Sequence, residues 1–403
     1  MVPVTMIVPV VKDVVKDRLL GTNLDVAFFT SIPMLGSFLF APVAGIISDK
    51  FQNRKYFIAA FCFLDAFLFY LLTLVQDMNL FLLIRFLEGA SHIFIIGLLL
   101  SSAADRENDP SNKRYYGKGV LMGITGMFLS LGGAFGMPLG VLGRKNPLLP
   151  FYVGSGILVF IGLVTLIKLK DTGIHNHKKF HWHLLKKAAL ENPYILIPFL
   201  FNFIDRFTVG FIISSFNIHL RETLGFHPGT LGLFLGLVLF PMSLLSYPSA
   251  MLSRKTGILP LVLVGSAMYG IFLGLAGTTN EFALLFIYLL LCGVGAGVMF
   301  VPSMMLASKM SKPGLTATTM SAFTGVGSLG FMLGPIVSFN LQEFYLVHLP
   351  KEIAFPSLSF TFGFLEILLV LITIPFFKKI LTKINRAEKE RDEISLANSS
   401  ALF

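Results

Sequence analysis

The chain has few charged residues and almost no tryptophan. Only 13% of its 403 residues are Asp, Glu, Lys or Arg, and it holds one Trp against 42 Phe. A soluble globular protein carries about 25% charged residues. Hydrophobic residues reach 55%, and the mean hydropathy is +0.78. This number of charged residues is too small to cover a water-facing surface. We therefore expect a multi-pass membrane protein rather than a set of soluble domains.

Cysteine is also scarce, and other chemical signatures are missing. The two cysteines, Cys62 and Cys292, lie inside apolar runs, which argues against a disulfide framework. The sequence shows no P-loop, no soluble sensor domain and no cluster of catalytic His and Asp, so a membrane enzyme or receptor is disfavoured. We expect no catalytic residue and no cofactor. The net charge of +10 comes from short segments between apolar runs, which does not indicate nucleic-acid binding.

The apolar runs have the length of membrane-spanning helices. A helix that crosses a bilayer needs about 20 apolar residues. Eleven runs meet this length, at residues 26–48, 56–75, 80–103, 119–142, 150–167, 194–216, 231–252, 258–276, 282–306, 316–339 and 355–377.

The opening stretch, residues 1–11, is apolar but short. Roughly eleven residues rise about 16 Å as a helix, half of a hydrocarbon core of about 30 Å. A shift of 204 positions brings residues 20–21 onto 224–225, both Leu-Gly, and Met1 onto Asp205, midway through the sixth run. We therefore expect two similar halves, with the opening helix of the first half truncated. A helix that is naturally short is the alternative.

Basic residues are distributed unevenly between the two sides of the predicted helices. One side and the tail hold 23 of the 32 Lys and Arg, the other side holds seven, and Arg85 and Arg206 lie inside runs. The positive-inside rule places the first set in the cytoplasm. We expect a protein of the bacterial cytoplasmic membrane, with both termini cytoplasmic if the first helix is complete.

The predicted organisation is two bundles and a linker. Residues 1–170 form an N-terminal six-helix bundle, 171–192 a cytoplasmic linker, 193–380 a C-terminal six-helix bundle, and 381–403 a cytoplasmic tail. The linker stretch KKFHWHLLKKAALENP is typical of a basic amphipathic helix on the inner leaflet. No Cys or carboxylate completes a metal site with its histidines, so no metal is expected; these are His175, His177, His181 and His183.

The segment GIISDKFQNRK, residues 45–55, resembles the loop signature of the major facilitator superfamily, G-x-x-x-D-(R/K)-x-G-x-(R/K)-(R/K). Gln52 stands where the family usually has Gly. The resemblance implies a cluster that latches the two halves in the outward-facing state. Its matching positions are Gly45, Asp49, Lys50, Arg54 and Lys55.

A second signature lies inside the run 80–103. Arg85-Phe86-Leu87-Glu88-Gly89 resembles R-x-x-(Q/E)-G of the same family. Helical spacing puts Arg85, Glu88 and His92 on one face. Ionisable groups at this depth are costly and suggest a functional site facing a cavity. The resemblance to proton-coupled members implies that Arg85 modulates a proton-carrying carboxylate; a purely structural Arg85–Glu88 pair is the alternative.

A third signature occurs once in each half. GGAFGMPLG resembles the antiporter pattern G-x-x-x-G-P-x-x-G-G, with Met137 interrupting it, and GFMLGP fits G-x-x-x-G-P. Small residues allow close helix packing, and proline bends a helix. The packing and bend positions are Gly132, Gly136, Pro138 and Gly140 in the first half, and Gly330, Gly334 and Pro335 in the second.

Further ionisable residues lie inside the runs. Asp65 and Glu366 are central in theirs, and Asp205 and Arg206 are adjacent, so we expect these two side chains to point apart. Asn202 shares a face with Asp205. Desolvation suits a buried carboxylate to carry a proton. The proton-coupling candidates are Glu88, Asp205, Asp65, Arg85 and Glu366, and the substrate-cavity candidates are Arg206, Asn202 and His92.

These features predict an all-α integral membrane protein with the twelve-helix fold of this superfamily, two six-helix bundles related by a pseudo-two-fold axis. We expect a secondary transporter, not an enzyme, that exports a small lipophilic or amphipathic compound in exchange for protons. The alternatives are a proton-coupled symporter for a small nutrient or organic anion, and a lipid or lysolipid flippase. The expected partners are the substrate, protons and the bilayer, with no nucleic acid, and the protein is expected to be a monomer.

Overall fold

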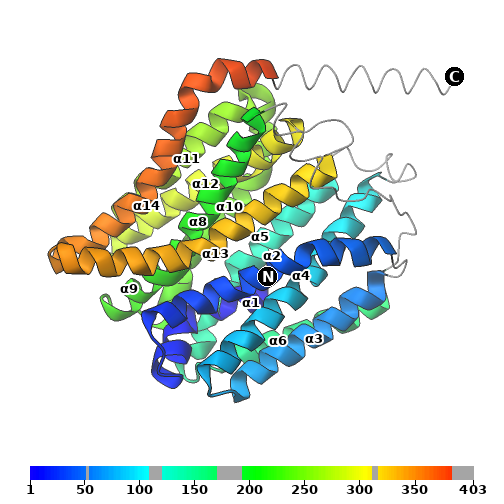
Figure 1. Ribbon diagram of the computed structural model, residues 1–403, viewed down its shortest axis with the longest axis vertical. Coiled ribbons are helices and arrows are strands. Elements are labelled where there is room, and N and C mark those ends of the chain that lie inside the picture. The colour runs from blue at the N-terminus through cyan, green and yellow to red at the C-terminus, as the bar shows by residue number, and fades with distance from the viewer. Residues whose placement is uncertain (51–53, 109–119, 170–192, 311–315, 384–403) are drawn as a thin grey trace.

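The computed structural model describes residues 1–50, 54–108, 120–169, 193–310 and 316–383. All regular secondary structure in these ranges is helical. Figure 1 shows the helices of the first half packed beside those of the second. This arrangement agrees with the predicted all-α fold.

Eleven helical segments of the described chain are long and apolar enough to cross a membrane, which confirms the number of complete spans expected. Their helices are α2 (Asn23–Lys50), α3 (Arg54–Leu74), α4 (Met78–Asn108), α5 (Val120–Leu139), α6 (Leu149–Lys168), α8 (Leu196–Phe211), α10 (Pro228–Thr256), α11 (Ile258–Ala276), α12 (Phe282–Met310), α13 (Thr316–His348) and α14 (Lys351–Thr373).

Several helices continue beyond the apolar runs that predicted them. The run 316–339 continues as helix to His348. The run 194–216 continues past α8 through the π-helix η5 (Ile212–Phe216) into α9 (Asn217–Glu222). Hydropathy marks where a chain leaves the hydrocarbon, whereas helical hydrogen bonding can continue into polar surroundings, so the runs predicted these helix ends too early.

The first eighteen residues are helical and largely buried. They form α1 (Val2–Met6), the 3-10 turn η1 (Val8–Val10) and the π-helix η2 (Lys12–Arg18). Prolines stand at the start of the first two pieces, and a proline cannot donate the hydrogen bond of a continuous helix. The apolar side chains of this segment, including Met6 and Val14, lie fully buried in the core of the first half.

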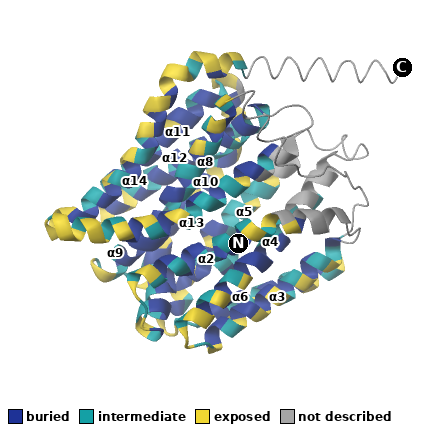
Figure 2. Ribbon diagram, in the orientation of Figure 1, coloured by how far each residue is buried: buried dark blue, intermediate teal, exposed yellow. Residues whose placement is uncertain are grey.

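Each half has its own hydrophobic core. One cluster consists mostly of residues between 6 and 158, and two others mostly of residues between 195 and 380. The halves meet where α2 packs on α13 and α5 packs on α10. Figure 2 shows exposed residues on the outer faces of the helices. Large apolar side chains such as Phe67, Phe128 and Phe160 are among the exposed residues of the molecule. Apolar outer faces are what a lipid environment requires.

The helices alternate in direction, which gives the molecule two ends. We call "basic end" the one where α2, α4, α6, α10 and α12 finish, because the segments there carry most of the basic residues of the sequence. We call "opposite end" the one where α3, α9, α11 and α13 finish.

Glycines of the two antiporter-like segments lie at close helix contacts. A Cβ on Gly136 would overlap Thr5 of α1, and a Cβ on Gly334 would overlap the Phe207 carbonyl of α8. A Cβ on Gly140 would overlap Pro9 and one on Gly330 the Phe203 carbonyl, whereas one on Gly132 would lie 3.3 Å from Met1. Pro138 and Pro335 stand inside α5 and α13. Each half therefore uses the same small-residue surface to hold its first helix.

We expect Gly334→Leu to destabilise the protein, because the new side chain would push α13 away from α8. Forcing extra atoms into a packed contact costs about 1–3 kcal/mol. The matched control is Gly156→Leu, since a Cβ on Gly156 meets no atom within 4 Å. Thermal unfolding of the purified protein in detergent measures both variants. Equal unfolding midpoints would show that the contact at Gly334 does not hold the helices together.

Candidate functional site

Four ionisable side chains meet between α3 and α4. Arg85 Nη1 donates to Glu88 Oε2 at 2.6 Å, one turn along α4. His92 Nδ1 lies 3.0 Å from Asp65 Oδ2 on α3. All four residues are buried, His92 being the most exposed at 9%. Two polar pairs therefore lie together inside the apolar first half.

The guanidinium of Arg85 is held in place by α2 as well as by Glu88. Its Nε and Nη2 donate to the Phe29 carbonyl oxygen at 3.3 and 3.2 Å. Its Cζ lies 4.5 Å from the centre of the Phe29 ring, a cation–π contact. A buried charge needs such partners, because water is not there to solvate it.

The helical spacing predicted that Arg85, Glu88 and His92 share one face of α4. The structure places Asp65 of the neighbouring helix α3 against that face. The link between α3 and α4 centres on Gln76, and Asp65 lies eleven residues before it, whereas Glu88 lies twelve after it. Antiparallel neighbours at equal distances from their connection lie at equal depth, so this count would have found the cluster. His92 binds Asp65, and its Nε2 has no partner among the described residues.

The same cluster has the spacing of a cation site. One ligand atom from each of Asp65, Glu88 and His92 lies within 4.8 Å of the others. Glu88, however, already forms an ion pair with Arg85, and the guanidinium of Arg85 would repel a divalent ion bound next to it. The Arg85–Glu88 pair therefore disfavours a metal ion at this cluster. The four linker histidines, at 175, 177, 181 and 183, lie outside the described residues.

The polar residues of α8 form a second group. Arg206 Nε lies 3.5 Å from Asp205 Oδ2, so the expectation that these neighbours point apart is wrong. An arginine side chain is long enough to fold back beside the preceding residue. Arg206 Cζ also lies 4.8 Å from the centre of the Phe300 ring, and its side chain is 23% exposed. Asn202 donates to the Phe323 carbonyl oxygen at 2.7 Å, which ties its amide to α13.

Glu366 lies in a different part of the second half. It is fully buried on α14 and accepts a hydrogen bond from Ser266 of α11. It does not join the cluster around Asp65, so the predicted proton-coupling residues divide between the two halves.

The predicted latch lies at the basic end. Gly45, Asp49 and Lys50 belong to the last turns of α2, and Arg54 and Lys55 begin α3. Arg54 is buried, with 4% of its surface exposed. Residues 51–53, between the two helices, lie outside the described ranges.

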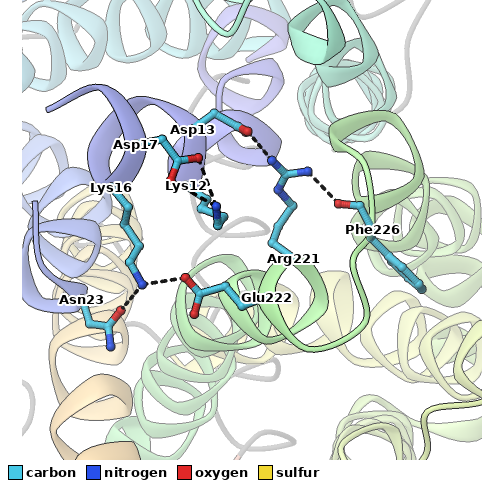
Figure 3. A network of polar contacts seen from close by, with 8 residues as sticks. All are labelled: Lys12, Asp13, Lys16, Asp17, Asn23, Arg221, Glu222 and Phe226. Atoms are coloured by element: carbon cyan, nitrogen blue, oxygen red, sulfur yellow. Dashed lines mark hydrogen bonds and ion pairs between the residues drawn. The ribbon is translucent and has the colours of Figure 1, made fainter. Parts of the chain in front are cut away.

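Ion pairs join the two halves at the opposite end (Figure 3). Lys16 Nζ lies 2.6 Å from Glu222 Oε1 and 3.0 Å from Asn23 Oδ1. Arg221 pairs with Asp13 and donates to the Phe226 carbonyl oxygen at 2.6 Å. The same two segments are also joined by a hydrogen bond in which Asn217 Nδ2 of α9 donates to the Val8 carbonyl oxygen at 2.9 Å. The first helical segments of both halves are thus bound to each other at this end.

These ion pairs between the halves were not predicted, although the offset that relates the two halves indicates which residues could meet. Lys16 and Glu222 lie 206 positions apart, close to the offset that relates the halves, and they carry opposite charges. Asp13, which lies outside the eleven spans, responds to pH: burial raises the pKa of its carboxyl, and the Arg221 guanidinium opposes the shift. Protonation of Asp13 removes its charge, so acid at this end weakens one of the two ion pairs.

Comparisons with known proteins agree with the fold. The sequence profile of the Major Facilitator Superfamily matches residues 1–335 and, in a second match, residues 198–391. No curated protein matches the chain.

Solved structures of two transporters are similar to the chain over nearly its whole length. A mutant form of the nucleoside transporter NupG superposes with a TM-score of 0.76 at 14% identity, covering 93% of this chain and 96% of its own. A bacterial homologue of the human lysosomal transporter Spinster, in an inward-facing and unoccupied conformation, gives 0.68 at 14% identity, covering 96% and 95%. At this identity the likeness concerns the fold.

We expect Lys16→Glu to open the opposite end, because it places two carboxylates against each other. A partly exposed ion pair contributes up to about 1 kcal/mol, a factor of about five in an open–closed equilibrium. A cysteine at Val8, in a background without Cys62 and Cys292, would report the opening through its rate of reaction with a thiol reagent.

The exchange of charges Lys16→Glu with Glu222→Lys is the matched control, since it restores the pair. Its labelling rate is expected to return to that of the parent. If Lys16→Glu and the double variant react at the same rate, the ion pair does not close this end.

Proposed function

Because the chain belongs to the major facilitator superfamily, we propose that it is a secondary transporter that exports a small lipophilic or amphipathic compound in exchange for protons. The observation that carries this proposal is the buried cluster of Asp65, Arg85, Glu88 and His92. Ionisable groups inside the membrane are costly, and they persist where a function needs them.

The contacts within the cluster support a role in proton exchange. Glu88 is neutralised by Arg85, and Asp65 shares a hydrogen bond with His92, whose ring nitrogens can donate or accept such a bond. A proton on Glu88 would release Arg85, and a proton on Asp65 would remove the charge that this carboxylate presents to His92. Either event redistributes charge between α3, α4 and α2, which are the helices that hold the cluster.

Alternating access fits the contacts at the two ends. The opposite end is joined by the pairs Lys16–Glu222 and Arg221–Asp13, and the basic end carries the proposed latch of residues 45–55. We assign the basic end to the cytoplasm, as the positive-inside rule suggests. Residues 1–170 and 193–380 then act as the two bundles, connected by residues 171–192 and followed by a cytoplasmic tail, residues 381–403.

We infer the substrate class from the residues beside Arg206 on α8. Arg206 rests on Phe300, and Phe and Met are abundant in the surrounding helices, which suits an amphipathic compound. The partly exposed guanidinium of Arg206 favours a second candidate, a symporter that imports an organic anion. The solved structure of NupG, which is similar to this chain in fold, is that of a nucleoside transporter.

A lipid flippase of this fold has less support. It needs an opening to the bilayer between the halves. An apolar groove of about 450 Å³ lies between α11 and α14, within the second half, where Gly270, Phe360 and Phe364 line it. This groove therefore does not supply such an opening.

We expect proton antiport to depend on the cluster. In everted vesicles with an acid lumen, lipophilic cations, lysolipids and organic anions are added in turn while lumenal pH is recorded. Alkalinisation by a compound indicates export, and Glu88→Gln or Asp65→Asn should abolish it, because neither amide can take up a proton. Glu281→Gln, at an exposed carboxylate, should leave it unchanged. Alkalinisation that persists in both cluster variants would contradict the proposal.

Arg206→Ala separates export from anion import. If Arg206 binds a substrate anion, the variant loses affinity for the anion while transport stays proton-dependent. If Arg206 acts on Asp205 in coupling, the proton dependence is lost instead. Uptake of radiolabelled anion in right-side-out vesicles, measured with and without a pH gradient, distinguishes the two. Uptake by the unmodified protein, without any alkalinisation in everted vesicles, would favour the symporter.

A further inference from the structure

Two hydroxyl side chains of α13 are exposed inside a membrane-spanning segment. Thr324 is exposed and Ser328 is partly exposed, and both lie within the candidate span Ala322–His348. The two residues are four positions apart, so they share one face of the helix. We call it the hydroxyl face of α13. Polar groups of a membrane helix turn toward the protein or toward a water-filled cavity rather than toward lipid.

The lipid-facing side of α13 is the opposite one. The exposed apolar residues Leu333 and Val337 mark it, with 36% and 40% of their surfaces exposed. Each residue turns an α-helix by about 100°, which puts these two side chains about 180° away from the hydroxyl face. Thr324 and Ser328 are therefore not exposed to the lipid on that side of the helix.

The hydroxyl face lies between two helix contacts of α13. A Cβ on Gly327 would lie 2.5 Å from Asn202 Nδ2 and 3.3 Å from Arg206 Cγ of α8. A Cβ on Gly325 would lie 3.7 Å from the Phe38 ring of α2. By the same helical rotation, the two glycines point about 80° to either side of the hydroxyl face. The hydroxyls thus open between α8 of the second half and α2 of the first, beside Arg206.

Arg206 has hydrogen-bond donors available for a ligand. Its Nε lies 3.5 Å from Asp205 Oδ2, and its Cζ lies 4.8 Å from the centre of the Phe300 ring. Among the residues that the structure describes, none forms a hydrogen bond with its two terminal nitrogens, and the side chain is 23% exposed. A guanidinium binds a carboxylate through two parallel hydrogen bonds, so this edge of Arg206 suits an anionic group.

The two hydroxyls offer acceptors rather than donors. Thr324 Oγ1 donates its proton to the Met320 carbonyl oxygen at 3.0 Å, and Ser328 Oγ donates its proton to the Thr324 carbonyl oxygen at 3.2 Å. A hydroxyl oxygen that has donated its only proton still accepts hydrogen bonds through its lone pairs. The hydroxyl face therefore suits a ligand group that donates, such as a hydroxyl or an amino group.

We propose that Arg206, Thr324 and Ser328 form a substrate-binding subsite for an amphipathic organic anion that carries a hydroxyl or amino group close to its anionic group. The proposal rests on the transport function proposed above. Arg206 binds the anionic group, and the oxygens of Thr324 and Ser328 accept hydrogen bonds from the donor. The two ligand groups must be close together, because both hydroxyls lie within one turn of Gly327, which contacts Arg206.

A pair of aromatic anions tests the hydroxyl face. 3-Phenyllactate and 3-phenylpropionate differ by one hydroxyl next to the carboxylate. Their affinities for the purified full-length chain in detergent are measured by isothermal titration calorimetry. We expect 3-phenyllactate to bind about fivefold more tightly, which is the net worth of one hydrogen bond. The Thr324→Val/Ser328→Ala variant, which lacks both acceptors, is expected to bind the two anions equally.

Thr382→Val is the matched control for this test. Thr382 is likewise an exposed threonine whose hydroxyl donates to the carbonyl oxygen four residues earlier, that of Lys378. This variant should keep the preference for 3-phenyllactate. Equal affinities for the two anions in the unmodified protein, or a preference that survives in the Thr324→Val/Ser328→Ala variant, would overturn the role of the hydroxyl face.

The neutral amide of the same compound tests Arg206. The unmodified protein should bind 3-phenyllactate at least about tenfold more tightly than 3-phenyllactamide, as expected for a hydrogen bond between charged groups. Arg206→Gln should remove this preference. If Arg206→Gln does not fold, Gly327→Ala provides the test, because its methyl group would displace Asn202 and the Arg206 side chain. An undiminished preference in the folded variant would show that Arg206 does not bind the anion.

The vesicle assay separates this proposal from the one on which it rests. If 3-phenyllactate binds with the expected preferences but no compound moves protons, proton exchange is wrong and the subsite stands. If neither aromatic anion binds while a lipophilic cation alkalinises the lumen, the subsite is overturned and the proposed export stands.

Discussion

The free-energy cost of charge inside an apolar medium determines how this molecule is built. Arg85 is bound by Glu88 and by the Phe29 carbonyl, Asp65 by His92, and Asp205 by Arg206. Each contact offsets part of a desolvation penalty that would otherwise expel the group from the membrane. A proton is the smallest change that can redistribute such pairs, and this is the physical basis of the proton coupling proposed above.

The two halves use the same packing but different polar chemistry. Glycines of α5 hold the first ten residues, and glycines of α13 hold α8. The polar groups of the halves differ. The first half has a cluster that includes the Arg85 guanidinium and the His92 imidazole, whereas in the second half Glu366 is bonded by the Ser266 hydroxyl. The ion pairs of Figure 3 join the two halves at the opposite end, and their residues belong to the first helical segments of both halves. In the second half, the helix that makes these ion pairs is the continuation of α8, which carries Asp205 and Arg206.

Much of this fold was predictable because lipid imposes strict rules on sequence. All eleven complete spans followed from hydropathy, since a chain in hydrocarbon must be both helical and apolar. The shared face of Arg85, Glu88 and His92 followed from helical periodicity. Contacts between helices were harder to predict. The contact of Asp65 with His92 could be predicted only by counting residues from the link between α3 and α4, which gives the depth of each residue in its helix. Arg206 folds back onto Asp205, against expectation, because backbone direction does not fix the position of a long side chain. The π-helical turns in η2 and η5 left no recognised signal in the sequence.

Proton release on ligand binding tests the central claim most directly. Purified protein in weakly buffered detergent solution, with a pH-indicating dye, is mixed with tetraphenylphosphonium as the lipophilic cation, then with a lysolipid, then with an organic anion. If substrate and proton compete for the buried carboxylates, one class of compound releases protons from the unmodified protein and none from the Asp65→Asn/Glu88→Gln variant. Saturable binding with no proton released, and identical traces for the two proteins, would contradict the account.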